Sequence, residues 1–333
     1  MKVISVYNNF ANTGGAQDMA LRLAGSFSPH TTPIVLTGTS AGHITGAYEK
    51  AADFMQLSRK QVKDILRRWP DAVFLSHDRK STTRLMIYKT MGLRNLKVVH
   101  VAHSVFDNLR RFTLFPEHVV AISKAVEANL KDYFKLPAQR ITMIPNGLPD
   151  RGVKEPRRGP GIRILLMGRI YALKRQLEIA EALDGYLPEG TELYFAGTGP
   201  QEHELTQLLA AKKNMHFLGQ IDPAKHICDY DYVLLFSQKE GLPLSLIEAC
   251  MYGRPMITNT LPSVLEINVP GTTGISCRDL DELRSMIKDL PAPSSREYIR
   301  MARNARERYG QLFTESRMNE AYRSLLEKAS TGK

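Results

Sequence analysis

The sequence predicts an α/β protein made of two doubly wound domains, each with a mostly parallel sheet. Short apolar runs alternate with helical stretches in both halves, which is typical of buried parallel strands joined by crossover helices. A charged segment punctuated by Gly and Pro, residues 151–160, separates the two series of strands. With 333 residues, the chain is long enough for two domains that each bury a core.

The expected strands are shared equally between the two halves. In the first half they are residues 3–7, 33–36, 72–76, 98–101 and 119–122. In the second half they are residues 163–167, 192–196, 215–218, 232–237 and 255–258. We place the first domain at residues 1–150 and the second at residues 151–333.

The stretch from about residue 296 to residue 328 is expected to be mainly helical. Its apolar residues recur at a spacing of three or four, as on one face of a helix: Tyr298, Ala302, Ala305, Tyr309 and Phe313. We assign these helices to the second domain, and the pattern leaves open whether they cross back to the first.

The composition is that of a soluble globular protein, with 43% apolar and 24% charged residues. No apolar run approaches the roughly 18 to 20 residues that span a bilayer, and the first strand leads straight into a polar turn. We therefore expect neither a signal peptide nor a membrane anchor. Cys228, Cys250 and Cys277 are odd in number and lack CxxC spacing, which fits a reducing cytosol better than a disulfide framework or a zinc site.

The net charge of +11 is concentrated in the first half of the chain. Residues 1–150 carry 20 Lys+Arg against 11 Asp+Glu, a net of +9, and the remainder carries 25 against 23, a net of +2. A basic surface of this kind attracts nucleic acid, anionic lipid or a phosphorylated substrate, and charge alone does not choose among them.

The segment from residue 237 to residue 249 is the most informative part of the sequence. A buried strand is expected to end near Ser237, and Pro243 suits the first turn of a new helix. Unpaired N–H groups at a helix start form a natural anion site for a diphosphate. The residues expected to form it are Gly241, Leu242, Pro243, Leu244 and Ser245.

Two glutamates flank this expected helix start. Glu240 precedes the helix and can reach a group beside the phosphates. Glu248 lies in the second turn and can accept two hydrogen bonds from a vicinal diol such as that of ribose. The alternative is that both carboxylates only complement the helix dipole and a solvated face.

The spacing of these glutamates resembles the signature of the retaining family 4 glycosyltransferases. That signature is Glu, seven residues and Glu, usually with Gly after the first and Ala after the second. Glu240, Gly241, Glu248 and Ala249 match it, and the run 253–255 continues it. The resemblance implies the GT-B fold, in which an acceptor-side and a nucleotide-sugar-binding domain, both Rossmann-like, face each other across a cleft.

Glycines and cations elsewhere extend the resemblance over most of the chain. Gly14 and Gly15 open a helix after the first strand, where family members carry a Gly-Gly turn that lets the backbone approach the donor phosphates. The alternative is an ordinary strand-to-helix turn. Gly168, Arg169 and Lys174 match a motif whose two cations are implied to clamp the diphosphate.

Three further features belong to the same comparison. Arg175 departs from the pattern, because many members have Gly at that position. Gly197 starts a Gly-x-Gly-Pro turn, whereas a dinucleotide-binding fingerprint would need a third glycine at the position of Glu202. The run 145–147, Pro-Asn-Gly, matches the turn that ends the first domain in similar enzymes.

Two histidines follow expected strands of the first domain. The resemblance implies that His103 reaches the donor sugar or its leaving group across the cleft. His77 is a weaker candidate, and either ring could instead be a structural hydrogen-bonding group. Metal binding is not expected, because neither Asp-x-Asp pair, at 229–231 and 279–281, lies at a phosphate-facing strand end.

Two first-domain stretches, residues 58–69 and 106–115, combine cations with apolar side chains. Lying on an anionic leaflet, such segments could bring the protein to a lipid-linked glycan acceptor. For the first stretch, the alternative is an amphipathic helix that packs on its own sheet. We therefore expect a cytoplasmic protein, in peripheral contact with the inner face of the cytoplasmic membrane.

Taken together, the motifs predict a metal-independent retaining transfer of a hexosyl group from a nucleoside diphosphate sugar, with UDP favoured, to a hydroxyl acceptor. The expected catalytic residues are Glu240, His103, Arg169 and Lys174. No cofactor is expected, and bacterial surface polysaccharide assembly (lipopolysaccharide, capsule or exopolysaccharide) is the expected role. The alternatives are a sugar-nucleotide epimerase or a phosphorylase of the same architecture, and a basic nucleic-acid-binding protein, although no nucleic-acid-binding motif is present.

Overall fold

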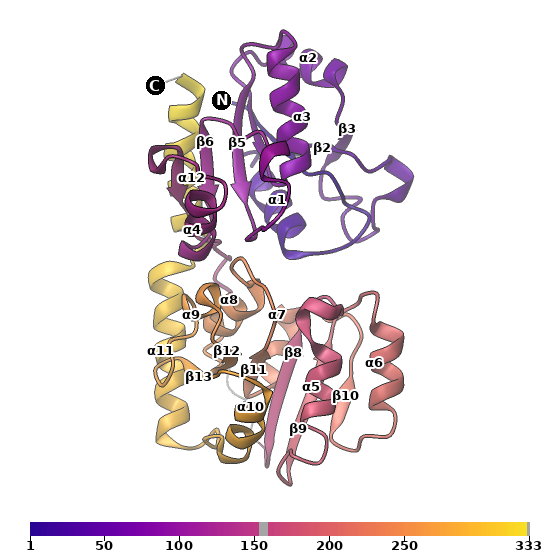
Figure 1. Ribbon diagram of the computed structural model, residues 1–333, viewed down its shortest axis with the longest axis vertical. Helices are drawn as coiled ribbons and strands as arrows, with labels where there is room; N and C mark the ends of the chain where they lie inside the picture. Colours follow the sequence, from indigo (N-terminus) through magenta and orange to yellow (C-terminus); the bar gives the residue numbers. More distant parts are fainter. Residues whose placement is uncertain (153–158, 332–333) are drawn as a thin grey trace. The chain divides into compact units, whose positions relative to one another are not determined.

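The computed structural model describes residues 1–152 and 159–331 (Figure 1). Contacts between residues divide the chain into two compact units. The first contains Met1–Asn146 and Ser316–Lys333, and the second contains Gly147–Glu315. Residues 153–158, which belong to the expected linker, lie outside the described residues. Each unit is an open α/β sheet, and the prediction of two doubly wound parallel-sheet units is confirmed.

The first unit contains a parallel seven-stranded sheet in the order β3-β2-β1-β4-β5-β6-β7. The strands are β1 (Val3–Val6), β2 (Ile34–Thr37), β3 (Asp53–Gln56), β4 (Val73–Ser76), β5 (Lys97–Ala102), β6 (His118–Ala121) and β7 (Ile141–Met143). The order reverses between β1 and β4. In open parallel sheets, ligands gather at the carboxyl ends of the strands beside such a reversal.

Helices α2 (Arg59–Arg68) and α3 (Arg79–Thr90) cover one face of this sheet, where their apolar side chains share a core with β1, β2, β4 and β5. The other helices of the unit are α1 (Gly15–Ser26), α4 (Lys124–Asp132) and α12 (Glu315–Thr331). The side chains of Ser58, Asp78 and Ser123 cap α2, α3 and α4 by accepting a hydrogen bond from the first helical turn.

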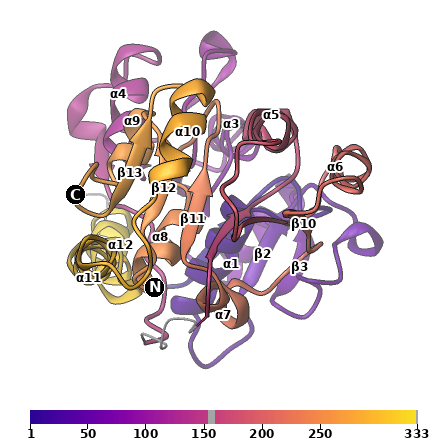
Figure 2. The same ribbon diagram turned by 90° about the horizontal axis from the view of Figure 1, so that it is seen from below.

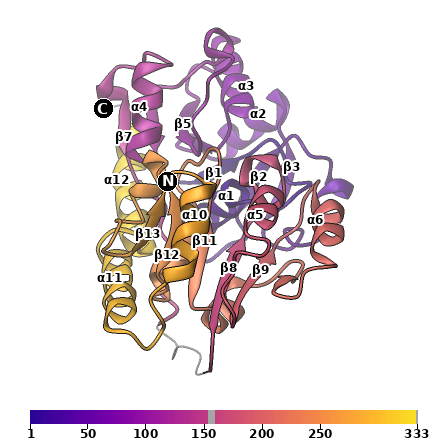
Figure 3. The same ribbon diagram turned by 60° about the horizontal axis from the view of Figure 1, so that its bottom comes forward.

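The second unit contains a parallel six-stranded sheet in the order β10-β9-β8-β11-β12-β13 (Figure 3). The strands are β8 (Ile162–Met167), β9 (Thr191–Ala196), β10 (Met215–Phe217), β11 (Tyr232–Leu235), β12 (Met256–Asn259) and β13 (Gly274–Cys277). Here the order reverses between β8 and β11, so the loops that follow these two strands flank the expected ligand position.

Helices cover both faces of the second sheet. The large apolar core is shared by α5 (Gln176–Ala182), α6 (Glu202–Leu209) and α10 (Leu280–Met286), together with the buried Tyr298. Figure 2 shows α8 (Leu244–Met251) and α11 (Arg296–Leu312) on the other side of the sheet. The two remaining helices are short: α7 (Pro223–His226) and α9 (Pro262–Leu265). Among the helices in 1–152 and 159–331, none is both long and apolar enough to cross a bilayer.

The C-terminal helical stretch is divided between the two units, which corrects the expected domain bounds. Residues 151–333 were assigned to the second domain, but Ser316–Lys333 belongs to the first. Helix α12 packs there because Asn319 donates to Ser26 Oγ at 3.1 Å and Lys97 Nζ donates to the Ser330 carbonyl. The chain first changes unit after Asn146, within the Pro-Asn-Gly turn, rather than after residue 150.

The break between α11 and α12 is held by the segment that enters the second unit. Leu148 N–H donates to the Phe313 carbonyl at 2.9 Å, and Glu315 N–H donates to the Leu148 carbonyl at 2.8 Å. The backbones approach so closely that a Cβ on Gly147 would lie 2.3 Å from the Thr314 carbonyl oxygen. Glycine at position 147 is therefore required by packing.

The ten expected strands are all present, with bounds shifted by one or two residues. The sequence interpretation missed β3, β7 and β13. All three lie at sheet edges, and β3 and β7 contain no fully buried residue. An edge strand that is wetted on one side has no continuous apolar run to detect.

Replacing glycine by alanine should have opposite effects at two positions of the second unit. Gly147→Ala should lower the free energy of unfolding by about 1–3 kcal/mol, because its Cβ meets a fixed backbone carbonyl. Gly310→Ala should raise it by about 0.5–1 kcal/mol, because Gly310 lies inside α11 with open space around it. Urea unfolding of the two variants measures both effects, and destabilisation of equal size would contradict the packing argument.

Candidate functional site

The loops that follow β8 and β11 lie side by side at the carboxyl ends of these neighbouring strands. Gln238 N–H, after β11, donates to the carbonyl of Leu173, after β8, at 2.8 Å. Asn259, at the end of β12, donates its side-chain amide to the Ser237 carbonyl at 2.5 Å. These two bonds fix the position of the β11 loop, where the sequence placed Glu240.

Lys174 and Glu240, which the sequence analysis selected separately, form an ion pair between these two loops. The distance from Lys174 Nζ to Glu240 Oε1 is 2.5 Å. The side chains keep only 19% and 9% of their exposure, so solvent screens the pair weakly. Ser263 Oγ in α9 supports the same loop by donating to the Glu240 carbonyl at 2.9 Å. The structure thus gives a sheltered pair of opposite charges at the strand-order reversal.

Helix α8 begins directly after this pair and lacks a side-chain cap. Pro243 is the N-cap residue, one position before the expected first turn, and its carbonyl accepts from Leu246 N–H at 3.2 Å. The N–H groups of Leu244 and Ser245 precede this first intrahelical bond. Glu248 lies in the second turn, as expected, and is half-buried. The helix start presents backbone donors to an anion.

The glycines after β8 and β9 are required for two reasons. Gly168 and Gly197 have backbone angles that L-residues rarely adopt, and the backbone at Gly197 and Gly199 touches the loop after β8. Gly168 and Gly197 have φ angles of +150° and +139°. A Cβ on Gly197 would lie 2.0 Å from the Gly168 carbonyl oxygen, and a Cβ on Gly199 would lie 2.1 Å from that of Ile170. The Gly-x-Gly-Pro turn therefore packs directly against the Gly168–Arg169 loop. Its direct contact with a ligand stays a prediction.

The two arginines of this loop have different surroundings. Arg169 is exposed and lies over the ring of Tyr171, with 5.5 Å from its guanidinium carbon to the ring centroid. Arg175 has a φ of +59°, in the left-handed region that favours glycine, which fits the Gly that many similar enzymes have there. Its guanidinium pairs with Glu178 at 2.7 Å. The departure from the family pattern is thus a strained residue held by a local ion pair.

In the first unit, Gly14 and Gly15 lie at the start of α1, after β1. Gly14 is the N-cap residue with extended backbone, and its N–H donates to the hydroxyl of Tyr48 at 3.2 Å. Tyr48 in turn donates to Asp18 at 2.5 Å. A Cβ on Gly14 would lie 2.8 Å from Oε1 of Gln17, whose buried side chain donates to the carbonyls of Asn9 and Asn12. The structure therefore shows a well-bonded strand-to-helix turn in which the contact with Gln17 favours glycine at position 14.

His77 and His103 form a stacked, hydrogen-bonded pair at the carboxyl ends of β4 and β5. The distance from His77 Nδ1 to His103 Nε2 is 2.9 Å, and the ring planes are 25° apart. The same sheet carries the fully buried His100, whose Nδ1 lies 2.7 Å from the hydroxyl of Thr82. The sequence singled out His77 and His103 without indicating that they touch.

Weak hydration keeps these three imidazoles neutral: His77 and His100 are buried, and His103 is half-buried. Loss of hydration lowers the pKa of His103 to about 4 and that of His100 to about 3. Burial, together with the neighbouring His103 and His100, holds the pKa of His77 well below its usual range. At neutral pH each ring therefore has one N–H and one lone pair.

The hydrogen-bond network assigns the tautomers of the pair. Among the described residues, His77 Nε2 is buried without a partner. A buried lone pair costs less than a buried N–H donor without an acceptor, so the proton of His77 belongs on Nδ1. His77 then donates to His103 Nε2, which leaves the proton of His103 on Nδ1. His103 is in this way prepared to donate a hydrogen bond, not to accept one.

Both Asp-x-Asp pairs have structural roles. Asp231 is buried, and its carboxylate accepts from Arg163 N–H at 2.8 Å. Asp279 caps α10, and Asp281 pairs with Arg284 at 2.6 Å. Across residues 1–152 and 159–331, no group of three or more His, Cys, Asp or Glu is placed to hold a metal ion.

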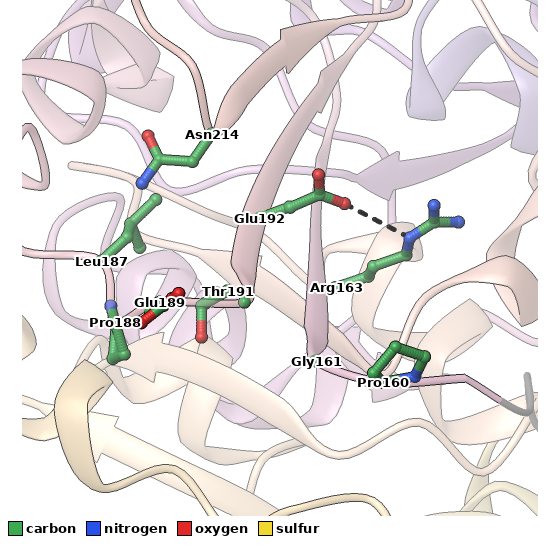
Figure 4. Close-up of a pocket in the computed structure, with 10 residues that line it drawn as sticks. Pro160, Gly161, Arg163, Leu187, Pro188, Glu189, Thr191, Glu192 and Asn214 are labelled. Carbon is green, nitrogen blue, oxygen red and sulfur yellow. Dashed lines mark ion pairs between the residues drawn. The ribbon is translucent and has the colours of Figure 1, made fainter.

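A shallow hollow of about 480 Å³ lies at the amino ends of β8 and β9 (Figure 4). Its lining includes Gly161, Thr191 and an ion pair between Arg163 and Glu192 at 3.5 Å. It lies at the opposite end of these strands from Gly168 and Gly197. The carboxyl ends carry the candidate residues, so this hollow is separate from them.

Ser263, Gln238 and Asn259 hold the β11 loop and were not predicted. Each acts through a bond to backbone that is distant in sequence. The only local signal was Pro262 at a helix start. Bonds of this kind depend on strand order, which a single sequence does not display.

Comparison with protein families matches two models along the chain. Residues 25–151 match Glycosyltransferase Family 4, and residues 161–291 match Glycosyl transferases group 1. The second match contains both glutamates and the Lys174 loop. Together the models cover most of both units.

Curated glycosyltransferases are similar to this chain over part of its length. D-rhamnosyltransferase WbpZ of Pseudomonas aeruginosa is 28% identical over 62% of this chain and 58% of its own length. Amylovoran biosynthesis glycosyltransferase AmsD of Erwinia amylovora is 22% identical over 77% of this chain and 80% of its own. The chain spans a little over half the length of the first curated relatives that it matches.

Solved structures show the same fold. HepE of Anabaena in complex with UDP and glucose has a TM-score of 0.84, with 98% of this chain and 99% of that chain covered. Its sequence identity of 16% means that the likeness concerns the fold alone. With the two family models and the paired parallel-sheet units, the chain belongs to the family 4 glycosyltransferases of GT-B fold.

Proposed function

We propose that this protein transfers a hexosyl group from a nucleoside diphosphate sugar, with UDP favoured, to a hydroxyl acceptor, with retention and without a metal ion. The observation that carries the proposal is the sheltered Lys174–Glu240 pair beside the uncapped start of α8. A carboxylate next to a diphosphate would be repelled. Lys174 offsets that charge and so allows Glu240 to lie near the phosphates.

Each of the residues around this pair binds a different part of the donor. The N–H groups that open α8 and the fork of Arg169 bind the diphosphate, whose charge grows as the sugar leaves. Glu248 accepts from the ribose hydroxyls, and Glu240 accepts from hydroxyls of the hexose. Lys174 donates both to Glu240 and to the departing phosphate. These cations and amides take the place that a divalent metal has in other glycosyltransferases.

The reaction proposed is a displacement on one face of the sugar. The acceptor oxygen forms a bond to the anomeric carbon as the bond to the β-phosphate oxygen breaks. The electron pair stays on the nucleoside diphosphate, and the acceptor proton passes to the departing phosphate. For His103 we propose a neutral donor role towards the sugar through Nδ1–H, with the ring held by His77.

For the acceptor we propose a lipid-linked glycan in bacterial surface polysaccharide assembly, met at the cytoplasmic membrane. Several relatives support this by name, among them O-antigen biosynthesis glycosyltransferase WbnH of Escherichia coli and the amylovoran enzyme AmsD. The basic first half of the chain fits an anionic surface. We propose a cytoplasmic, peripherally bound protein.

Retention and metal independence are tested together. The protein is incubated with a UDP-hexose and a glycan acceptor in EDTA, and the anomeric signals of the product are read by proton NMR. The proposal expects full activity and the donor's own anomeric configuration. An inverted product or complete loss of activity with EDTA contradicts it, and conversion of the donor without acceptor would indicate an epimerase.

Neutralising either member of the ion pair should stop turnover without unfolding the protein. Glu240→Gln and Lys174→Met should each lower kcat by about 100-fold or more, roughly 2.7 kcal/mol of barrier, because each removes a positioned charge. The matched controls are Asp184→Asn and Lys212→Met, which break a pair of 2.6 Å in the same unit. The assignment fails if either site variant keeps a third of wild-type kcat while its thermal midpoint is unchanged.

The lowered pKa values of these histidines predict that the folded protein loses stability in mild acid. Their folded pKa lies below the unfolded value of about 6.5, so the unfolded chain alone gains protons as pH falls from about 6.5 towards 4. Each such histidine should cost up to about 1.4 kcal/mol per pH unit in that window. Urea unfolding at pH 7 to 5 should show a shallower pH slope for His103→Gln than for wild type. Equal pH slopes for His103→Gln and wild type would refute a neutral His103 in the folded state.

A further inference from the structure

We propose that α2, α3 and the loop 106–115 form one docking surface for an anionic bilayer leaflet, into which the loop tip inserts. We call it the basic–apolar face, defined as residues 58–69, 79–94 and 106–115. The inference deepens the proposed function, on which it rests only for the choice of a lipid-linked acceptor. It names the part of the first unit that meets the membrane.

The positive charge of the first half is confined to this part of the chain. Residues 58–115 carry 13 Lys+Arg against four Asp+Glu, a net of +9. The other residues of the first half carry seven of each. Nine of the 13 cations are exposed: Arg59, Lys60, Lys63, Arg67, Arg68, Lys80, Arg94, Arg110 and Arg111. Only two exposed acids, Asp71 and Asp107, accompany them.

Helix α2 supplies charge to the face but no inserting group. Its apolar residues Val62 and Ile65 are buried in the core, and Leu66 and Trp69 pack against that core. This is the amphipathic packing that the sequence analysis held as the alternative for residues 58–69. The cations of α2 remain outside, where they attract anionic headgroups.

The loop 106–115 exposes apolar side chains among cations. Phe112 keeps 76% of its exposure, Leu109 60% and Leu114 43%. Arg110 and Arg111 lie between them in a 3-10 turn, Arg110–Phe112. Bulky apolar groups next to arginines suit the boundary between headgroups and acyl chains, where the cations meet phosphates while the apolar groups enter.

The loop is anchored at both ends, so this exposure is built into the fold. Arg79 donates two hydrogen bonds of 2.8 Å to Asn108 and lies over the ring of Phe106 at 3.8 Å. Leu114 N–H donates to Thr83 Oγ1 at 3.2 Å. Between the anchors, Leu109 has a φ of +54°, a conformation that L-residues avoid. A strained leucine on an exposed tip indicates a function for the tip.

Helix α3 connects the loop with α2. Near the end of α3, Ile87 and Met91 keep 42% and 58% of their exposure, and Arg59 of α2 donates to the Met91 carbonyl at 2.7 Å. On the other side, Thr90 and Leu114 line a common hollow of about 320 Å³. Five of the large exposed apolar side chains of the chain thus lie on a continuous, strongly basic face: Ile87, Met91, Leu109, Phe112 and Leu114.

An anionic bilayer fits this face better than nucleic acid does. Single-stranded nucleic acid requires several aromatic side chains on which bases stack, and Phe112 is the one aromatic residue among the large exposed apolar groups in 1–152. Protruding aliphatic side chains gain nothing from phosphates in water but do gain from acyl chains. The loop also follows β5 shortly after His103, so a lipid surface at this face lies near His103.

Vesicle binding tests the proposal without any assay of transfer. Full-length protein is sedimented with phosphatidylcholine vesicles that contain 0 or 30% phosphatidylglycerol, as chosen compositions, at low and high salt. Binding should require the anionic lipid and weaken with salt. Leu109→Ser with Phe112→Ser should bind at least about 10-fold more weakly, and so should Arg110→Ser with Arg111→Ser. In the Phe112→Trp variant, brominated lipid should quench the fluorescence of the new side chain, above the background of Trp69.

Matched variants distinguish binding through the basic–apolar face from nonspecific binding to vesicles. Ile299→Ser removes a 57% exposed apolar side chain from α11, and Arg317→Ser with Arg323→Ser removes two exposed cations from α12. Both should bind vesicles as wild type does. Equal binding to neutral vesicles, equal loss in the control variants, or stronger binding to an oligonucleotide than to anionic vesicles overturns the proposal. Transfer to a soluble acceptor should be unchanged in the loop variants, so failure of docking and failure of the proposed activity are distinguishable.

Discussion

The contact between Lys174 and Glu240 is the interaction on which the candidate site depends. It joins the loops after β8 and β11, the two strands between which the strand order of the second sheet reverses. A cation and a carboxylate with little exposure hold each other in place, and so fix where a diphosphate and a sugar hydroxyl would be bound. The adjacent start of α8 lacks a side-chain cap, so backbone donors are available at the same place.

Close contacts fix the positions of the two loops that carry this pair. The turn at Gly197 and Gly199 presses on the Gly168 loop at distances that exclude a Cβ, and Ser263 holds the loop of Glu240. In the first unit the equivalent edge has a different character. There, a neutral histidine pair presents one N–H, and the neighbouring basic–apolar face is suited to a charged lipid surface.

Much of the fold could be predicted because strands that are buried on both faces have continuous apolar runs in the sequence. The strands that escaped, β3, β7 and β13, are edge strands, and the chain crosses back at Ser316 through contacts that no local pattern encodes. Glu240, Glu248 and Lys174 were selected by their match to motifs of a known family. The contact between Lys174 and Glu240 was not predicted, because it depends on β8 and β11 being neighbours. His77 similarly acquires a role only through its contact with His103.

Donor binding tests the central claim most directly, since a ligand that binds only the folded state must raise its stability. Thermal unfolding is measured in EDTA with a panel of nucleoside diphosphates and their sugars, for wild type, Glu248→Gln and the exposed α5 control Glu181→Gln. We expect one nucleoside diphosphate to stabilise wild type and the control by about 2.7 kcal/mol at 100 times its Kd, and Glu248→Gln much less. Stabilisation of equal size in Glu248→Gln, or none in wild type with any member of the panel, would contradict this account.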